Sequence, residues 1–438
     1  MLDQHSWALL RRLTRWLDQF KDCFGHRAQH VSLRQYVDGL LGDSARKSMS
    51  AMLERISEPT SYQAFQHFIT HAPWDAEVVW RRLRAVVPER TGILILDETS
   101  FPKSGPHSVG VARQYCGALG KVANCQVAVT AALWTGRRAW PVGALLYLPE
   151  EWMRDRARRT AARIPATVAF QEKWRLALTL LRRSRAAGLT LTAVVADAEY
   201  GDNSTLRQTL HRLRVPYALG ISPTLTVFRG TPTLRIDREQ RPPRNRRHGW
   251  PDQEPVSVRT LSDALSPRTW RRVQWRNGTN SPWAADFAAL RVTPATDWRH
   301  RRLAPEVWLL CERGLGSTGR RKHYVVALPA SASLKQLVRL AHHRWAIEQH
   351  YQDCKTELGL DHFEGRTYPG WQHHMAISAV AYAFVQTERM RPRAGPPLTF
   401  PQARAFVQEI FTGLLFVSRP RYMQWMKQAE QRFRQLRI

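Results

Sequence analysis

The amino-acid sequence predicts a mixed α/β fold that follows an N-terminal helical domain and is interrupted by an insertion. Helical spacing dominates the first 88 residues, and short apolar segments alternate with helical ones from residue 91 onward. Between residues 222 and 320 the helical period disappears, and Pro, Arg and Trp become frequent. We therefore divide the chain into a helical domain, an α/β domain in two segments, a strand-rich insertion and a basic helical tail, over residues 1–88, 89–221 with 321–392, 222–320 and 393–438.

The helical domain is indicated by the segment "WALLRRLTRWLDQF". Its apolar residues Leu10, Leu13, Leu17 and Phe20 recur at spacings of three and four. Later segments, "SLRQYVDGLLG" and "SARKSMSAMLERI", also have a helical pattern and carry Arg or Lys. This pattern fits a basic DNA-binding module and fits a structural bundle almost as well.

Two apolar segments of the α/β domain read as buried strands that each end in a carboxylate. The segment "TGILILD" ends at Asp97, and "LTLTAVVAD" ends at Asp197. Between them we predict a helix over 168–187, which Gly188 ends. Because ligands of open α/β sheets bind at the carboxyl ends of strands, the two acids are expected at one edge of the sheet.

The charge of the chain points to a polyanionic partner. The sequence has 66 Lys and Arg residues against 36 Asp and Glu residues, a formal net charge of +30, and most of the cations are Arg. A planar guanidinium binds phosphate through two parallel hydrogen bonds, which an ammonium group cannot do. An Arg-rich genome accounts for part of the Arg excess but not for the net sign. We therefore expect the protein to bind nucleic acid.

The five cysteines lie far apart and form no CxxC pair. This spacing is typical of a reduced cytoplasmic protein and argues against a disulfide framework or a zinc finger. No apolar run approaches the length of a membrane span, and the N-terminus has no signal-peptide pattern. We expect a cytoplasmic protein without a membrane partner.

A third acid comes from a helix predicted over 333–357. Arg344, Glu348 and Lys355 share one face of that helix, so Glu348 can face the two strand ends. Three carboxylates that meet repel one another by roughly 4 kcal/mol per pair at about 4 Å, for an effective dielectric of about 20. A single acid at a strand end is more typical of a cap, but three acids in a basic chain favour a site for Mg²⁺ or Mn²⁺, since both metals prefer oxygen ligands.

Three sequence blocks resemble the DDE-type transposases of bacterial insertion sequences. They are "LDETSFPKSGPHSVGVARQYCGALGKVANCQVAV", "VVADAEYGDN" and "RWAIEQHYQDCKTELGLDHFEGR". More narrowly, they are similar to the branch with a Tyr-Arg-Glu-Lys signature around its glutamate. The resemblance covers about residues 30–390 and implies a ribonuclease H-like catalytic domain, a mixed sheet with flanking helices, interrupted by a strand-rich insertion. It also implies that Asp97, Asp197 and Glu348 are the catalytic carboxylates and hold two Mg²⁺ (or Mn²⁺) ions.

The same resemblance assigns residues to DNA binding. Arg344 and Lys355 match the Arg and Lys of the signature, which contact the backbone of the transposon end, whereas Ala341 stands in place of its Tyr. Trp298 is our choice among six insertion tryptophans for stacking on a flipped base. Three further cations follow the first catalytic acid and are expected along the DNA path: Lys103, Arg113 and Lys121.

Glu98, Glu199 and Asp202 are rival metal ligands, which we rank lower because they do not directly end the apolar runs. The implied function is a transposase that binds the terminal inverted repeats of its element, cleaves the DNA and joins the ends to target DNA. Its implied partner is double-stranded DNA, bound by a homodimer or larger assembly at the bacterial nucleoid. Two alternatives stay open: a catalytically idle DNA-binding protein descended from a transposase, and a metal-dependent nuclease that does not join DNA.

Overall fold

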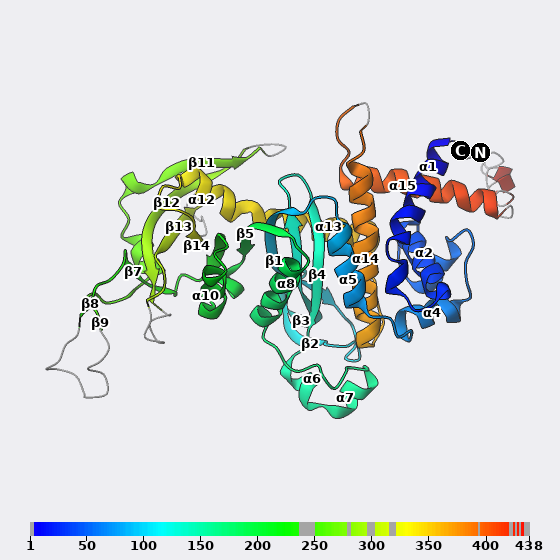
Figure 1. Ribbon diagram of the computed structural model, residues 1–438, viewed down its shortest axis with the longest axis horizontal. Coiled ribbons are helices and arrows are strands. Elements are labelled where there is room, and N and C mark those ends of the chain that lie inside the picture. Colours follow the sequence, from blue (N-terminus) through cyan, green and yellow to red (C-terminus); the bar gives the residue numbers. More distant parts are fainter. Residues whose placement is uncertain are drawn as a thin grey trace.

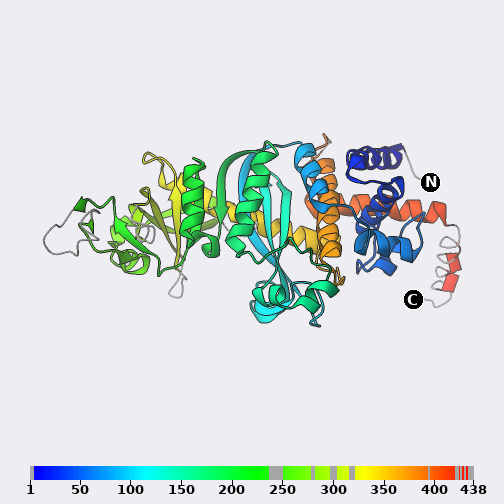
Figure 2. The ribbon, with the colours of Figure 1, turned by 60° about the horizontal axis from the view of Figure 1, so that its bottom comes forward.

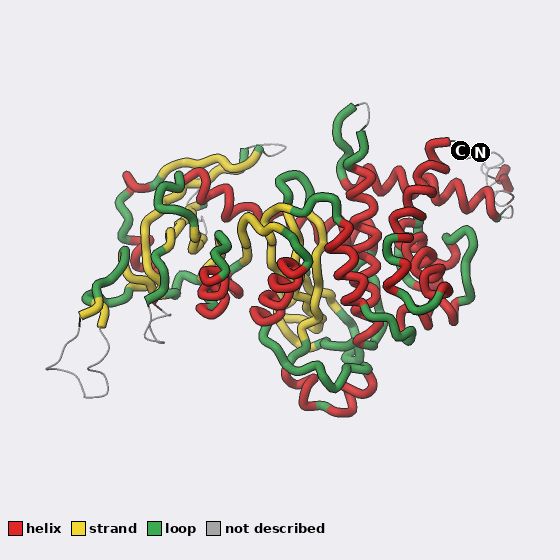
Figure 3. The backbone as a smooth tube through the Cα atoms, viewed as in Figure 1, coloured by secondary structure: helices red, strands yellow, loops and turns green. Residues whose placement is uncertain are grey.

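The computed structural model describes residues 4–235, 250–277, 282–295, 303–314, 321–392 and 395–419, together with 424, 427–428 and 431–432. The molecule is elongated, with the strands of the predicted insertion at one end, a central sheet in the middle and most helices at the other end (Figure 1). Figure 3 shows the same division, with strands confined to the first two parts. None of the described helices combines the length and apolar character needed to cross a bilayer.

The central sheet has the order β4-β3-β1-β5-β6. β3 pairs antiparallel with both β1 and β4, whereas β5 pairs parallel with both β1 and β6. This order and these directions form a ribonuclease H-like mixed sheet, which confirms the predicted fold class. The strands are β1 (Thr91–Pro102), β3 (Lys121–Trp134), β4 (Ala139–Tyr147), β5 (Thr190–Ala196) and β6 (Tyr217–Ile221).

Most strands of the insertion extend this sheet, whereas β8 and β9 pair with each other in a separate two-stranded sheet. β14 (Arg321–Ala327) pairs antiparallel with β6 on one side and with β13 (Val307–Arg313) on the other. Next to β13 in the sheet lies β12 (Trp283–Pro294), which also pairs antiparallel with β7 and with β11. The remaining elements of this region are β7 (Thr226–Arg229), β8 (Leu234–Arg235), β9 (Trp250–Pro251), β10 (Val256–Ser257), α11 (Val258–Asp263), η3 (Pro267–Thr269) and β11 (Arg271–Arg276).

Different helices cover the two faces of the central sheet. Side chains of a strand alternate between faces, so neighbours on β1 meet different helices. Ile95 packs against Ala346 and Ile347 of α13 (Trp345–Leu358), whereas Leu94 and Leu96 join the main core, which includes side chains of α8 (Lys173–Ala186). The shorter elements around the sheet are β2 (Ala112–Cys116), α6 (Glu150–Arg154), α7 (Arg156–Ala161), α9 (Ala198–Gly201), α10 (Ser204–Arg212) and α12 (Leu334–Ala341).

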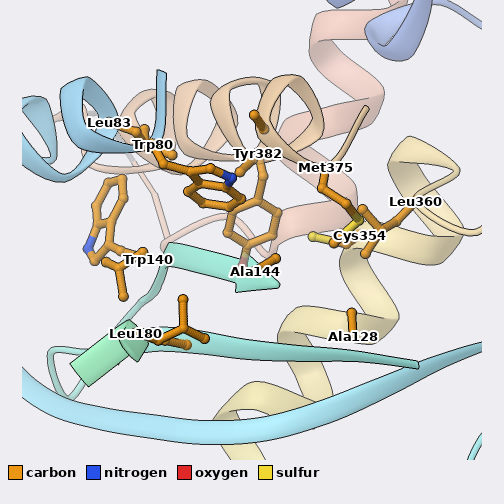
Figure 4. Close-up of a cluster of buried hydrophobic side chains, with 14 of the residues drawn as sticks. Trp80, Leu83, Ala128, Trp140, Ala144, Leu180, Cys354, Leu360, Met375 and Tyr382 are labelled. Carbon is orange, nitrogen blue, oxygen red and sulfur yellow. The ribbon is translucent and has the colours of Figure 1, made fainter. Parts of the chain in front are cut away.

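Helices from both ends of the chain share one core with β4. α14 (Tyr368–Arg389) is buried along most of its length and packs against β4 and against helices of the N-terminal segment. Figure 4 shows Trp80, Trp140, Leu180 and Tyr382 in this core. Figure 2 shows α14 between the sheet and the N-terminal helices. These helices and α15 are α1 (Gln4–Asp18), η1 (Lys21–Cys23), α2 (Arg27–Leu41), α3 (Met49–Glu54), α4 (Tyr62–Thr70), α5 (Ala76–Val86) and α15 (Phe400–Ser418).

The predicted helix over 333–357 is interrupted. α12 ends at Ala341, a short 3-10 turn, η5 (His342–Arg344), follows, and α13 begins at Trp345. α12 packs on β6 and β11, whereas α13 packs on β1 and β4, so the break lets each half follow a different part of the twisted sheet. It also places Arg344 at the N-terminus of α13.

Candidate active site

Asp97 lies within β1, on the face that α13 covers, just beyond the last residue of β1 that pairs with β5; the strand does not end at Asp97, as the sequence predicted, but continues to Pro102. Its side chain points to the same face as Ile95, two residues earlier on β1. Only 4% of the residue is exposed, and its Oδ2 accepts a hydrogen bond from Nη1 of Arg344 at 2.7 Å. A buried carboxylate requires a partner of this kind, because a charge removed from water is costly when unpaired.

Glu348 lies one helical turn after Arg344 and contacts the same guanidinium. Nη2 of Arg344 donates a hydrogen bond to Oε1 of Glu348. The guanidinium therefore bridges Asp97 and Glu348, residues that are 251 positions apart in the chain. Two of the three predicted acids are thus brought together around one cation.

Asp197 follows β5 directly and caps the short helix α9, where its carboxylate accepts a hydrogen bond from the backbone N–H of Glu199 at 3.1 Å. α9 lies so close to β6 that a Cβ added to Gly201 would lie 1.8 Å from the backbone oxygen of Gly220. The two glycines therefore let α9 rest on β6. This packing fixes Asp197 at the carboxyl edge of the sheet, beside the bridged pair.

The pKa shifts show that the three acids and Arg344 interact. The pKa of Asp97 is raised to about 7. Burial is the main cause, the charge of Arg344 opposes it, and the charges of Asp197 and Glu348 add to the rise. Burial also raises the pKa of Asp197, again against the effect of Arg344. Burial lowers the pKa of Arg344, but Asp97, Glu348 and Asp197 together raise it above its ordinary value. Arg344 is therefore the charge that compensates the acids.

The donor set fits a divalent cation only after Arg344 moves. Within the described ranges, no group of three or more acidic, histidine or cysteine side chains is already close enough to hold a metal ion. The hydroxyl of Tyr200 is fully buried and has no hydrogen-bond partner among the described residues, and its pKa is raised by burial and by nearby carboxylates, including Asp97 and Asp197. Mg²⁺ and Mn²⁺ prefer oxygen ligands, so either ion could take the place of the Arg344 guanidinium between the carboxylates.

The three rival acids are engaged elsewhere. Glu98, the next residue on β1 after Asp97, points to the opposite face, where Nζ of Lys173 lies 2.7 Å from Oε2 of Glu98. The same ammonium lies 2.9 Å from Oε1 of Glu199. Asp202 accepts a hydrogen bond from the backbone N–H of Ser222 at 2.9 Å. Lys173 thus neutralises a second pair of acids on the far face of the sheet.

A cavity of about 450 Å³ opens beside the acids, between the sheet edge and the strands of the insertion. Asp197, Arg344 and Glu348 line one side of it, and Trp283 of β12, whose exposed fraction is 57%, lines another. The guanidinium of Arg276 stacks on the ring of Trp345 at 3.6 Å and also lines the cavity. A cavity with acids, cations and an exposed indole is suited to a polyanion with aromatic bases.

The ammonium groups of Lys355 and Lys103 donate hydrogen bonds to backbone carbonyls. Nζ of Lys355 donates to the carbonyl of Ser100 at 3.1 Å, and Nζ of Lys103 donates to the carbonyl of Phe363 at 2.5 Å. Both groups are partly buried, so they hold the segment after Asp97 against α13 and the loop that follows it.

The other predicted DNA contacts lie apart from the acids. Arg113 and Lys121 are exposed on the β2–β3 hairpin, and neither of them lines the cavity beside the acids. Trp298 lies outside the described residues.

Sequence reasoning missed Arg276, Lys173 and Tyr200, and it did not select Trp283. The alternation of β1 could have separated Glu98 from Asp97, and a lysine in α8 facing that side was a possible partner. No local signal could have identified Arg276 or Trp283, because their position depends on how β11 and β12 pair with the rest of the sheet.

The family of the chain is shown by a comparison of its sequence with family models. A family model described as "DDE superfamily endonuclease" matches residues 19–282, more than half of the chain. A probable transposase for insertion sequence element IS701 from Microchaete diplosiphon is 31% identical over 189 residues, which cover 42% of this chain and 46% of that relative. The chain therefore matches less than half of the relative's length. A cryo-EM structure of piggyBac transposase in a synaptic complex with hairpin DNA gives a TM-score of 0.43 at 8% identity, over 91% of this chain and 73% of that one.

Proposed function

Because the chain belongs to the DDE superfamily endonucleases, we propose that it is a transposase that cuts DNA at the ends of an insertion sequence and joins them to target DNA. It would recognise the terminal inverted repeats of its own element. The observation that carries this proposal is the bridge from Arg344 to Asp97 and Glu348, next to Asp197, at one edge of a ribonuclease H-like sheet. These are the three acids that the sequence resemblance assigns to catalysis.

Asp97, Asp197 and Glu348 would hold two Mg²⁺ or Mn²⁺ ions. Such ions, when bound, lower the pKa of an attacking water or 3′-hydroxyl and stabilise the leaving oxygen. Asp97 acts as a ligand in its ionised form, and Arg344 must leave the two carboxylates. A phosphate of the DNA is the natural new partner for the released guanidinium, because it offers the same bidentate geometry as a carboxylate.

The net charge of +30 supports DNA as the partner. The cavity beside the acids would take the end of the duplex, with Arg276 and Lys322 near its phosphates and Trp283 near an exposed base. Two ends must be paired for transposition, so the protein would act as a dimer or larger assembly at the bacterial nucleoid. Lys103, Lys355, Arg113 and Lys121 stay proposed contacts of the DNA path.

The test replaces each acid by its neutral amide, in Asp97→Asn, Asp197→Asn and Glu348→Gln. Each variant should lose Mg²⁺-dependent cleavage of a DNA fragment that carries the element's end, yet still bind that fragment. Glu199→Gln is the matched control, because Glu199 lies near Asp197 but is paired with Lys173. Cleavage retained by the three variants, or lost only in the control, would refute the assignment.

Two alternatives give different outcomes in the same system. A nuclease that does not join DNA would cleave the fragment but would fail to insert pre-cleaved ends into a plasmid. An idle DNA-binding protein would bind the fragment without cleavage in Mg²⁺ or Mn²⁺. The three acids that the resemblance requires are all present in the chain, which disfavours the idle protein.

A further inference from the structure

A second groove lies between α8 and α10, two helices that stand next to each other in Figure 1. Its volume is about 580 Å³, and it lies where both helices end. Arg182 and Arg185 line it from α8, and Arg212 lines it from α10, with Ala186, Thr209 and Leu213 between them. All three arginines are exposed, and no acidic residue of the described part of the chain lines the groove.

These arginines have no acidic partners among the described residues. On the same helix, Arg175 and Arg183 are paired with Glu172 and Glu77. None of the ion pairs between described residues involves Arg182 or Arg185. Among the residues that the structure describes, Arg212 donates a hydrogen bond to the hydroxyl of Thr209, at 3.2 Å, and to no acid. The groove therefore concentrates positive charge that no described acidic residue neutralises.

The positive lining continues into an adjacent cavity of about 600 Å³, which Arg212 and Arg214 line. The acidic residue of that cavity, Glu306, already accepts two hydrogen bonds from Arg291. Arg214 has a φ of +53°, and Arg163 is the other non-glycine residue with a positive φ in the described part of the chain. In this conformation glycine is favoured over a residue with a Cβ by about 1 kcal/mol, so the backbone conformation gives no reason for an arginine at this position.

The groove is far from the catalytic acids. Gly188 precedes β5 on the side of the groove, and Asp197 follows β5 at its other end. The seven residues of β5 separate the two edges by about 23 Å. This distance corresponds to about seven base pairs of B-DNA, so a phosphate in the groove cannot be one that the acids act upon.

The position of each arginine, taken alone, has a simple structural explanation, because cations near the C-terminus of a helix interact favourably with the helix dipole. That explanation accounts for an arginine on each helix. It does not account for three guanidinium groups that converge on one groove without an acid, since like charges repel.

We propose that this groove, lined by Arg182, Arg185 and Arg212, is a second binding surface for the phosphate backbone of duplex DNA, separate from the catalytic edge. The inference rests on the proposed function. The DNA is either the inner part of the transposon end or the target duplex, and the chemistry of recognition is the same for both.

The test compares the triple variant Arg182→Gln, Arg185→Gln, Arg212→Gln with a control that removes three acid-paired exposed arginines, Arg46→Gln, Arg154→Gln and Arg175→Gln. Both triple variants lose three positive charges. All six side chains are exposed, so both variants should fold normally, and circular dichroism checks this. The probe is a random-sequence linear duplex, titrated at several salt concentrations. The groove variant should bind more weakly, with a log–log salt slope smaller by about 2–3, while the control should change much less.

Two further measurements identify the source of the DNA. Loss of insertion into a supercoiled plasmid with normal end cleavage assigns the groove to target DNA. Loss of end cleavage on long but not short end fragments assigns it to the transposon end. Equal salt slopes for the two triple variants, with a wild-type protein that binds DNA, would overturn this inference alone. A wild-type protein that does not bind DNA would overturn the proposed function as well.

Discussion

Nη1 of Arg344 lies 2.7 Å from Oδ2 of Asp97, and the same guanidinium contacts Glu348 through Nη2. A cation of the protein thus lies between two carboxylates that we assign to divalent metal. In the absence of metal this ion pair limits the mutual repulsion of the acids. The same pair competes with any metal ion for those oxygens, so metal binding and release of Arg344 are coupled.

Replacement of Arg344 by Ala should separate the stabilising effect of Arg344 on the acids from its competition with metal ions. The metal-free variant should be less stable by about 1–3 kcal/mol, because buried Asp97 loses its partner while Arg344 itself is partly exposed. Mg²⁺ should bind the variant more tightly than the wild type, since its competitor is gone. Thermal unfolding with and without Mg²⁺ and calorimetric titration measure both quantities. Arg339→Ala, an exposed arginine of α12, is the control, and equal behaviour of the two variants would contradict the coupling.

Asp97 should make the stability of the metal-free protein dependent on pH. Its pKa is raised to about 7 in the folded protein, so between pH 4 and 7 the folded state binds a proton that the unfolded state lacks. This contribution is present at low pH and is lost as the pH rises through 7. Relative to Asp97→Asn, the wild type should therefore lose on the order of 2–3 kcal/mol between about pH 5 and pH 8.

Denaturant unfolding of both proteins across that pH range measures the difference. Because the comparison is between two variants, other titrating groups cancel unless they touch Asp97. Parallel stability curves for the two proteins would mean that Asp97 is ionised throughout. Saturating Mg²⁺ should flatten the wild-type curve, since a bound ion keeps the carboxylate charged.

The sequence allowed prediction of those features that depend on local pattern. The apolar runs before Asp97 and Asp197 indicated buried strands, and Asp197 follows β5 directly, as predicted. The prediction that a strand ends at Asp97 is wrong, because β1 continues to Pro102 through its antiparallel pairing with β3. The two acids still lie at the same level, because Ile95 of β1 pairs in parallel with Val195 of β5. Gly188 ends α8 with a φ of +76°, as predicted, although that helix begins at Lys173 and not near residue 168. Such features depend on a few neighbouring residues, so periodicity and end signals are sufficient.

Features that depend on distant pairing could not be predicted. The break at His342–Arg344 follows from the packing of α12 on β6 and β11, and no residue in "AHHRWAIEQ" signals it. The continuation of the sheet from β6 into β14 requires two segments that are about 100 residues apart to pair. The alternation of apolar and polar residues shows which side chains of a strand share a face, but it does not show which strand pairs with which.

Gly201→Ala should disturb the position of Asp197. The added methyl group would lie 1.8 Å from the backbone oxygen of Gly220, so α9 must move away from β6. Overpacking of this kind costs about 1–3 kcal/mol, and the shift of Asp197 should reduce cleavage far more than the stability loss explains. Gly105→Ala is the control, because a Cβ at Gly105 meets nothing within 4 Å. Normal cleavage by a destabilised Gly201→Ala protein would show that α9 does not position Asp197.

Trp283→Ala should weaken binding of DNA ends that carry an unpaired base. Trp283 is the exposed indole that lines the cavity with Asp197 and Glu348, which makes it a better structural candidate for base stacking than any tryptophan outside the cavity. Loss of one stacking contact costs about 1–3 kcal/mol, or roughly 5- to 150-fold in affinity, and Trp283→Phe should recover part of it. The affinity for fully paired ends should change little.

Fluorescence anisotropy with paired and unpaired ends measures this difference, and Trp7→Ala provides the control, because Trp7 is an exposed indole of α1. Trp298→Ala is compared in the same assay, since the sequence favoured that residue. A loss confined to Trp298→Ala would assign stacking to Trp298 and leave Trp283 as a wall of the cavity. Equal losses for paired and unpaired ends in Trp283→Ala would indicate a contact to the backbone instead of a base.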